Sequence, residues 1–340
     1  NDASGWNFGH LDNPEKSEYN YVKEVDYISG ASLMIRKDIW KQLGGFDERF
    51  VPAYYEDTDL AYQVRQYGYK VVYQPFSVVT HFEGISRGTD ENSGIKKHQA
   101  ENKDKFYNKW KSVLLDESSP NAKNDFLHRD RSSSKKKILV IDHYVPHYDQ
   151  DAGSRSTFSY IKLFVKMGYS VTFIGDNFYR HQPYTNILQK LGVEVLYGDY
   201  YQRNIFDWIK TNGQYFDFII CHRFHITPKY LKSLRESTNA KIAYVGHDLQ
   251  FLSSLRKYEI TKEEHHLTES ESFKETETKI FNAVDIIFPF STYEAPFIKE
   301  IVPEKIVETL PVYFYEKIPN ATNSFSKRKD LLFIGFFGHP

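Results

Sequence analysis

The chain has 340 residues, of which 40% are hydrophobic and 26% charged, and its formal net charge at pH 7 is -1. This length favours two domains, and the composition is that of a soluble globular protein, without the apolar run of about 20 residues that a membrane helix needs. Balanced charge argues against nucleic acid as a partner. The single cysteine, Cys221, excludes an internal disulfide, so we expect a cytoplasmic protein, at most peripherally associated with the inner face of the membrane.

Residues 1–115 carry a mixture of short strand and helix patterns. They show no β-α-β unit at their start, which is typical of the later half of a domain rather than of a complete one. In chain order, the patterns predict a strand over 25–36, a helix over 37–45, an amphipathic helix over 58–69, a strand over 70–82 and a helical tail over 95–114.

Three acids crowd the predicted start of the amphipathic helix: Glu56, Asp57 and Asp59. Free backbone N–H groups and the helix dipole favour negative charge there, so N-capping explains one or two of them. Sugar transfer with inversion also needs a carboxylate that accepts the proton of an attacking hydroxyl. Asp57 is the candidate base, and Glu56 either steadies it or binds the acceptor. Tyr55, just before them, offers a flat apolar face with a polar rim that suits a sugar ring.

Other polar side chains follow in the same region. His81 comes directly after an apolar run, and a histidine at a strand end can ligate a divalent metal that bridges a nucleotide diphosphate. Lys96 and Lys97 offer cations suited to phosphate, although, taken alone, a solvated lysine face is the better explanation of this pair.

The segments VDYISGASLMIRK, LGGFDERFVPAYYEDTDLAYQVRQYGYKVVYQP and THFEGISRGTD resemble, in order and spacing, the acceptor-side half of an inverting glycosyltransferase family 2 domain of GT-A fold. The resemblance implies Asp57 as the catalytic base, Ser29, Gly30 and Ala31 along the sugar site, and a Mn²⁺ or Mg²⁺ ion with His81 as a ligand. The family's nucleotide-binding half, with its Asp-x-Asp motif, is expected before Gly5, so we expect this chain by itself to be inactive at that site.

Residues 116–137 are rich in serine, asparagine and charge, and we predict a linker there. Residues 138–340 alternate short apolar runs with amphipathic segments, which predicts a buried parallel sheet with helices on both faces. The runs are ILVID, SVTFIG, VEVLYG, FDFIIC, KIAYVG and DIIFPF, and a last strand, DLLFIGFFGHP, begins a second lobe that is cut off.

After the first run, Gly153 and Ser154 open a helix whose exposed N–H groups suit a phosphate or a sugar hydroxyl, although an ordinary capped turn fits equally well. The segments PHYDQDAGSRS, FDFIICHRFHITPKYL, AYVGHDLQFLSSLR and LLFIGFFGHP resemble the N-terminal lobe of glycosyltransferase family 4 enzymes of GT-B fold. The resemblance implies retention of anomeric configuration, contact of His222 or His247 with the transferred sugar, and a bond from Asp248 to a hydroxyl.

The chain is therefore predicted to be α/β, a partial GT-A domain (1–115) followed by the Rossmann-like lobe of a GT-B domain (138–340). The predicted function is transfer of sugar from a nucleotide-sugar donor to a glycan or lipid-linked glycan acceptor in bacterial surface polysaccharide synthesis. A non-catalytic glycan-binding or scaffold module is the alternative. A nucleotide-dependent oxidoreductase is disfavoured because no GxGxxG follows the first strand.

Overall fold

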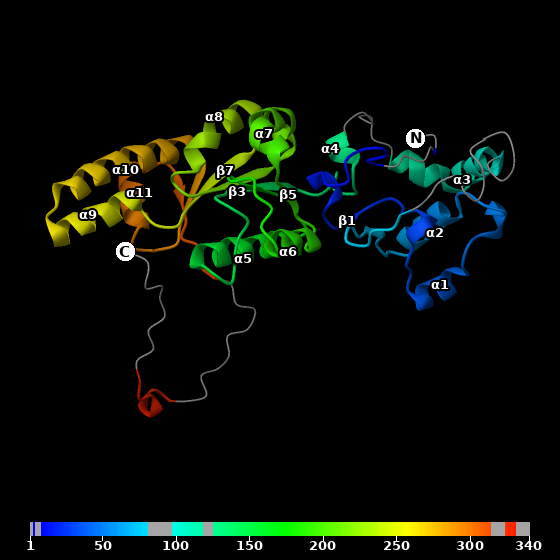
Figure 1. Ribbon diagram of the computed structural model, residues 1–340, viewed down its shortest axis with the longest axis horizontal. Helices are drawn as coiled ribbons and strands as arrows, with labels where there is room; N and C mark the ends of the chain where they lie inside the picture. The colour runs from blue at the N-terminus through cyan, green and yellow to red at the C-terminus, as the bar shows by residue number, and fades with distance from the viewer. Residues whose placement is uncertain (1–2, 4–7, 81–96, 118–124, 314–323, 331–340) are drawn as a thin grey trace.

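The computed structural model describes residues 3, 8–80, 97–117, 125–313 and 324–330, and it is a mixed α/β structure (Figure 1). A seven-stranded parallel sheet with helices on both faces forms the larger part. A second part, built mainly of helices with one two-stranded antiparallel sheet, comes from the first 117 residues.

The elements before residue 117 include one small sheet of two short strands. Strand β1 (Lys23–Glu24) pairs antiparallel with β2 (Val72–Tyr73). The three predicted helices of this part are confirmed. Together with the short 3₁₀ turns, the helical elements are η1 (Ser17–Tyr19), η2 (Gly30–Ser32), α1 (Lys37–Leu43), η3 (Glu48–Phe50), α2 (Glu56–Gln66) and α3 (Lys97–Asp116).

The predicted strand over 25–36 is wrong. Of the one predicted over 70–82, the structure describes residues 70–80, and among these only 72–73 form a strand. In the first case, the N–H of Gly30 bonds to the Asp57 carboxylate and the side chain of Ser29 accepts from the N–H of Ala31. The backbone N–H groups of Gly30 and Ala31 therefore bond to side-chain oxygens and not to a neighbouring strand. In the segment predicted as a strand over 70–82, Val78 and Val79 are exposed, so this apolar run does not form part of a buried sheet.

The parallel sheet has the strand order β5-β4-β3-β6-β7-β8-β9, so the chain moves outward from β3 in one direction and then returns to continue from β3 in the other. This is the doubly wound arrangement that the alternating pattern predicted. All six apolar runs form strands, and β9 was not predicted. The strands are β3 (Lys137–Asp142), β4 (Ser170–Gly175), β5 (Glu194–Leu196), β6 (Phe218–His222), β7 (Lys241–Gly246), β8 (Ile286–Pro289) and β9 (Ile306–Val307).

Helices cover both faces of this sheet, with α5 and α6 on one side and α7 and α8 on the other (Figure 1). Strand β3 is apolar on both faces, because Ile138 and Val140 join one hydrophobic cluster while Leu139 and Ile141 join the other. Both faces of the sheet therefore need helices to cover them. The helices of this part, with one 3₁₀ turn, are α5 (Ala152–Lys166), α6 (Tyr184–Lys190), α7 (Asp199–Asn212), η5 (Gly213–Tyr215), α8 (Thr227–Ser237), α9 (Gln250–Thr261), α10 (Glu264–Ala283) and α11 (Ala295–Ile301).

The segment predicted as a linker, 116–137, is described only at 116–117 and from 125 onward, where it forms α4 (Asp125–His128). Arg129 then makes two bonds to the buried Glu194 of β5, at 2.7 and 2.6 Å. Arg131 bonds to Asp26 of the first part. This stretch therefore contacts both parts of the molecule, and the division of the chain into two domains at this point stays a prediction.

The predicted last strand, 330–340, lies outside the described residues apart from Asp330, and η6 (Phe325–Lys327) precedes it. Among the helices that the structure describes, none is both long and apolar enough to cross a membrane.

Candidate functional site

The first candidate site is centred on Asp57, in the first turn of α2. Its Oδ2 accepts a hydrogen bond of 2.7 Å from the backbone N–H of Gly30, and its Oδ1 accepts one of 2.7 Å from the N–H of Thr58. Asp57 is half-buried, and Gly30 with its neighbours Ser29 and Ala31 is exposed. The structure thus brings together two segments, 27 residues apart, that the sequence assigned to one sugar site.

The backbone that leads into α2 is strained. Tyr54 and Tyr55 have φ angles of +75° and +70°, a left-handed conformation that costs a non-glycine residue about 1–2 kcal/mol. The side chain of the buried Asn102, on α3, holds this loop by donating to the carbonyls of Phe50, Ala53 and Tyr54 at 2.9, 2.8 and 3.1 Å. Strain that the surroundings enforce is typical of functional sites.

The three acids of this turn have different surroundings. Asp59 is fully buried, and its carboxylate accepts from the indole N–H of Trp110 at 2.7 Å and from Nζ of Lys109 at 2.8 Å. Glu56 and Asp57 are half-buried. Asp59 is therefore a structural residue, whereas Glu56 and Asp57 are only partly buried.

The structure gives Tyr55 a packing role as well. Its ring lies 5.3 Å from that of Phe106 between centroids, and its hydroxyl donates to the carbonyl of Ala3 at 2.9 Å. The side chain predicted to meet a sugar thus also fixes the loop before α2 to the helix behind it. His81 and Lys96 lie outside the described residues, and Lys97 is the first residue of α3, with a side chain that is also outside them.

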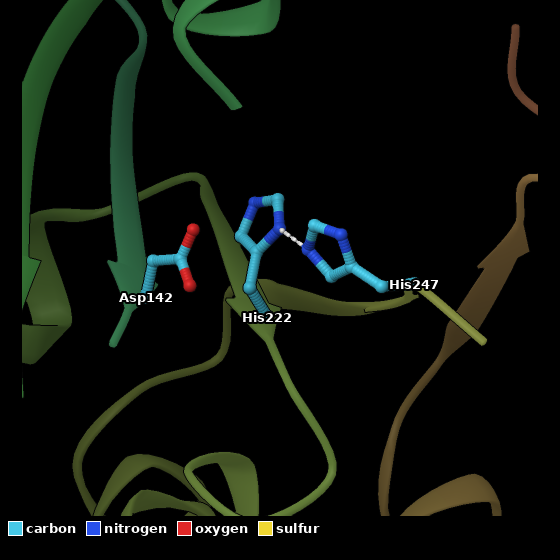
Figure 2. A group of neighbouring side chains, drawn as sticks. All are labelled: Asp142, His222 and His247. Carbon is cyan, nitrogen blue, oxygen red and sulfur yellow. Dashed lines mark hydrogen bonds between the residues drawn. The ribbon is translucent and has the colours of Figure 1, made fainter. Parts of the chain in front are cut away.

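The second candidate site lies at the carboxyl edge of the parallel sheet, between β3 and β6, where the strand order reverses. Ligands of doubly wound sheets bind in the crevice at this point. Asp142 ends β3, His222 ends β6, and His247 directly follows β7. Figure 2 shows the carboxylate and the two imidazoles gathered there, with Nδ1 of His222 lying 3.3 Å from Nε2 of His247.

Asp142 is held by several donors. Its Oδ1 accepts from the N–H of His143 at 2.7 Å and from Nε of Arg223 at 3.1 Å, and its Oδ2 accepts from the hydroxyl of Thr157 at 2.9 Å. Burial by itself raises the pKa of Asp142, but His222, Arg223 and His247 outweigh it and lower that pKa to about 2. Asp142 is therefore ionised at neutral pH.

The two histidines are neutral at the same pH. Burial lowers the pKa of His222, and it lowers the pKa of His247 to about 3, with the charge of Arg223 acting in the same direction on both. A neutral imidazole keeps one nitrogen lone pair, so each ring can accept a hydrogen bond or ligate a metal.

Gly153 and Ser154 lie at the start of α5, beside this cluster. A Cβ on Gly153 would meet Nη2 of Arg223 at 2.7 Å and the ring of His247 at 3.1 Å, so a larger residue here would displace the guanidinium and crowd the imidazole. Ser154 is buried, and both its N–H and its hydroxyl bond to the capping residue Asp151, at 2.7 and 2.6 Å. The structure thus brings Gly153 to the histidines, while Ser154 belongs to the helix cap.

Asp248 is exposed on the turn after β7. The sequence analysis missed Asp142 and Arg223, which contact the predicted residues. A signal for this edge is present in the sequence, because histidines recur after several of the apolar runs. The histidines in these loops and strand ends are His143, His147, His181, His222, His225 and His247.

No protein-family model matches the chain. Over 76 residues, 22% of its length, it is 37% identical to N-acetylglucosaminyl-diphospho-decaprenol L-rhamnosyltransferase of Mycobacterium tuberculosis, of which it covers 24%. It is 28% identical over 85 residues, 25% of its length, to 9% of the uncharacterized protein y4gI of Sinorhizobium fredii. The chain thus spans about a quarter of the length of the curated rhamnosyltransferase, and a segment of it is similar to part of a glycosyltransferase.

Among solved structures, UGT73P12 of Glycyrrhiza uralensis, complexed with glycyrrhetinic acid 3-O-monoglucuronide, aligns with a TM-score of 0.33 at 10% identity, over 52% of this chain and 49% of that one. Glucose dehydrogenase of Haloferax mediterranei aligns with a TM-score of 0.24 at 16% identity, over 48% of each chain. Both scores are low, and they identify neither a shared reaction nor a shared ligand.

Proposed function

We propose that this chain is part of a tandem glycosyltransferase that transfers sugar from a nucleotide-sugar donor to a growing surface glycan. In this proposal, residues 1–115 belong to an inverting GT-A domain and residues 138–340 to the first lobe of a retaining GT-B domain. Two findings support it: the identity to part of a rhamnosyltransferase, and the convergence of Asp57 with Gly30 at a strained turn. The second is the observation that carries the proposal.

Asp57 acts in the first domain as the general base. An acceptor hydroxyl donates its proton to the carboxylate as the oxygen attacks the anomeric carbon. Oδ1 of Asp57 accepts from both the N–H and the hydroxyl of Thr58, at 2.7 and 3.3 Å, whereas Oδ2 accepts only the N–H of Gly30 among the bonds that the structure shows and has a second lone pair for the acceptor hydroxyl. A carboxylate at a helix start suits a proton that leaves late, as the sugar approaches an oxocarbenium-like state.

The first domain is proposed to use Mn²⁺ or Mg²⁺, which neutralises the charge of the departing nucleotide diphosphate when bound. The resemblance gives His81 as a ligand of this ion, while Glu56 is proposed to steady Asp57 or to bind the acceptor. Lys96 and Lys97 are proposed to bind phosphate.

The acceptor is proposed to be a lipid-linked diphosphate sugar, because the rhamnosyltransferase that matches part of the chain is named for such a substrate. In the second domain, the crevice at the carboxyl edge of the sheet is proposed to take the sugar. Its predicted contacts there are Gly153, Ser154, His222, His247 and Asp248.

The test is Asp57→Asn in the full-length protein. Transfer of labelled sugar from a panel of nucleotide sugars to a lipid-linked acceptor is expected to fall at least about 100-fold, because asparagine cannot take the proton. The matched control is Asp38→Asn, an exposed acid in the first turn of α1, which should keep wild-type turnover. Equal turnover of Asp57→Asn and wild type would refute the base. A wild-type protein that binds glycan but transfers from no donor would favour the non-catalytic module.

A further inference from the structure

The carboxyl edge of the parallel sheet carries a group of side chains that resembles a metal-binding set. Asp142, His222 and His247 each offer one ligand atom, and these atoms all lie within 4.8 Å of one another. They come from the ends of three adjacent strands, β3, β6 and β7, and Figure 2 shows the ring of His222 between the carboxylate of Asp142 and the ring of His247. We propose that these three residues bind a divalent transition metal of the Zn²⁺ class.

The ligand types select this class of ion. Two imidazole nitrogens and one carboxylate oxygen suit Zn²⁺ and its neighbours, whereas Mg²⁺ and Ca²⁺ prefer oxygen alone. The two histidine nitrogens are 3.3 Å apart. In the structure these two nitrogens share a proton in a hydrogen bond, and the ion is proposed to take the place of that proton. Two nitrogens bound at about 2.1 Å to one tetrahedral ion are about 3.4 Å apart, so this spacing fits such an ion. Three protein ligands leave a fourth position for an exogenous oxygen.

Neighbouring groups hydrogen-bond to the carboxylate ligand, Asp142. The hydroxyl of Thr157 and the N–H of His143 both bond to Asp142, which fixes the orientation of the carboxylate, as outer-shell partners do in metal sites. Asp142 and His222 are only 2% and 3% exposed, while His247 is half-buried. Of the three ligands, His247 is therefore the one most open to solvent.

One cation lies close to the group. Nε of Arg223 is 3.1 Å from Oδ1 of Asp142, so this guanidinium pairs with the carboxylate in the structure. The guanidinium is partly exposed and sits at the end of a flexible side chain, so it can move as the ion binds. This site is separate from the Mn²⁺ or Mg²⁺ proposed for the first domain, and it stands whether or not the chain transfers sugar.

The experiment is a titration of the chelator-treated full chain with Co²⁺, followed by its visible absorption, and with Zn²⁺, followed by calorimetry. Bound Co²⁺ is expected to show the intense visible absorption of a Co²⁺ ion with few ligands. One equivalent of Zn²⁺ is then expected to bind and to displace the Co²⁺. His247→Ala should weaken Zn²⁺ binding more than about 100-fold and Thr157→Val about 10-fold, because loss of outer-shell partners alone costs about 10 to 100-fold.

One control separates this site from other histidines. The exposed group Glu263, His265 and His266 also places three ligand atoms within 4.8 Å, so the double variant His265→Ala/His266→Ala tests surface binding. This double variant should bind Zn²⁺ as wild type does. The proposal is overturned if wild type binds no Zn²⁺, if folded His247→Ala binds it normally, or if only the control variant loses it.

Folding is checked by circular dichroism and by thermal melting without metal. His247 is only half-buried, so His247→Ala is expected to fold as wild type does. The buried ligands are tested by Asp142→Asn and His222→Ala. If these two variants fail to fold, the Zn²⁺ affinities of His247→Ala and Thr157→Val still test the proposed site.

Discussion

The two candidate sites hold their carboxylates in opposite ways. Asp57 is half-buried at a helix start and accepts from the backbone N–H groups of Gly30 and Thr58. Asp142 is buried at a strand end and lies among a guanidinium, two imidazoles and a threonine hydroxyl. The first arrangement keeps a lone pair of Oδ2 available to a hydroxyl, which suits a base. The second commits the carboxylate to its neighbours, which suits a ligand or positioning role.

Two acids within one turn of α2 also differ in their surroundings. Asp59 lies two residues after Asp57, but it is fully buried against Lys109 and Trp110. Removing one partner of a buried ion pair costs about 3–5 kcal/mol, so Asp59→Asn should lower the free energy of unfolding by that amount in denaturant titrations. Asp57→Asn should cost no more than about 1 kcal/mol. Equal destabilisation by both variants would contradict the separate roles.

A buried acid of the sheet part extends the comparison to pH. Glu277, on α10, accepts from the N–H groups of Gln250 and Phe251 at the start of α9, and burial raises its pKa to about 7. Its folded pKa lies above the ordinary value of 4.5, so its contribution to stability is complete below pH 4.5 and is lost as the pH rises through 7. The loss amounts to about 3 kcal/mol.

Unfolding titrations at pH 5 and pH 8 measure this effect. The wild type should lose more stability over this range than Glu277→Gln, whose amide does not ionise. Identical pH dependence in the two proteins would show that Glu277 ionises in the folded state as it does in water.

A smaller effect is expected at the glycine that faces Asp57. A Cβ on Gly30 would lie 3.3 Å from Cβ and Oδ2 of Asp57, closer than most such contacts. Gly30→Ala should therefore shift the carboxylate by a few tenths of an ångström and lower transfer about 10-fold, since misplacement of 1 Å costs about 100-fold. Ser32→Ala, in the same exposed turn, is the control and should be silent. Full activity of Gly30→Ala would place the reacting hydroxyl elsewhere.

Periodicity predicted the sheet part well because its strands are buried on both faces. A run such as ILVID is apolar at every position, and its alternate residues join two different hydrophobic clusters in the structure. The same rule failed for residues 25–36, which are also rich in apolar residues but use backbone groups to bond Asp57 and Ser29. Hydrophobicity alone does not say whether a strand has a neighbour.

The sequence by itself determined the alternation of strands and helices and the acid-rich start of α2, since these depend on neighbours within a few residues. It also offered Gly30 and Asp57 as one site, through resemblance. Only the tertiary structure decided that Asp59 is fully buried while Asp57 is only partly buried, and that Asp142 meets His222 and His247. The physical reason is that strand order brings together residues 80 and more positions apart, and spacing along the chain carries no record of that order.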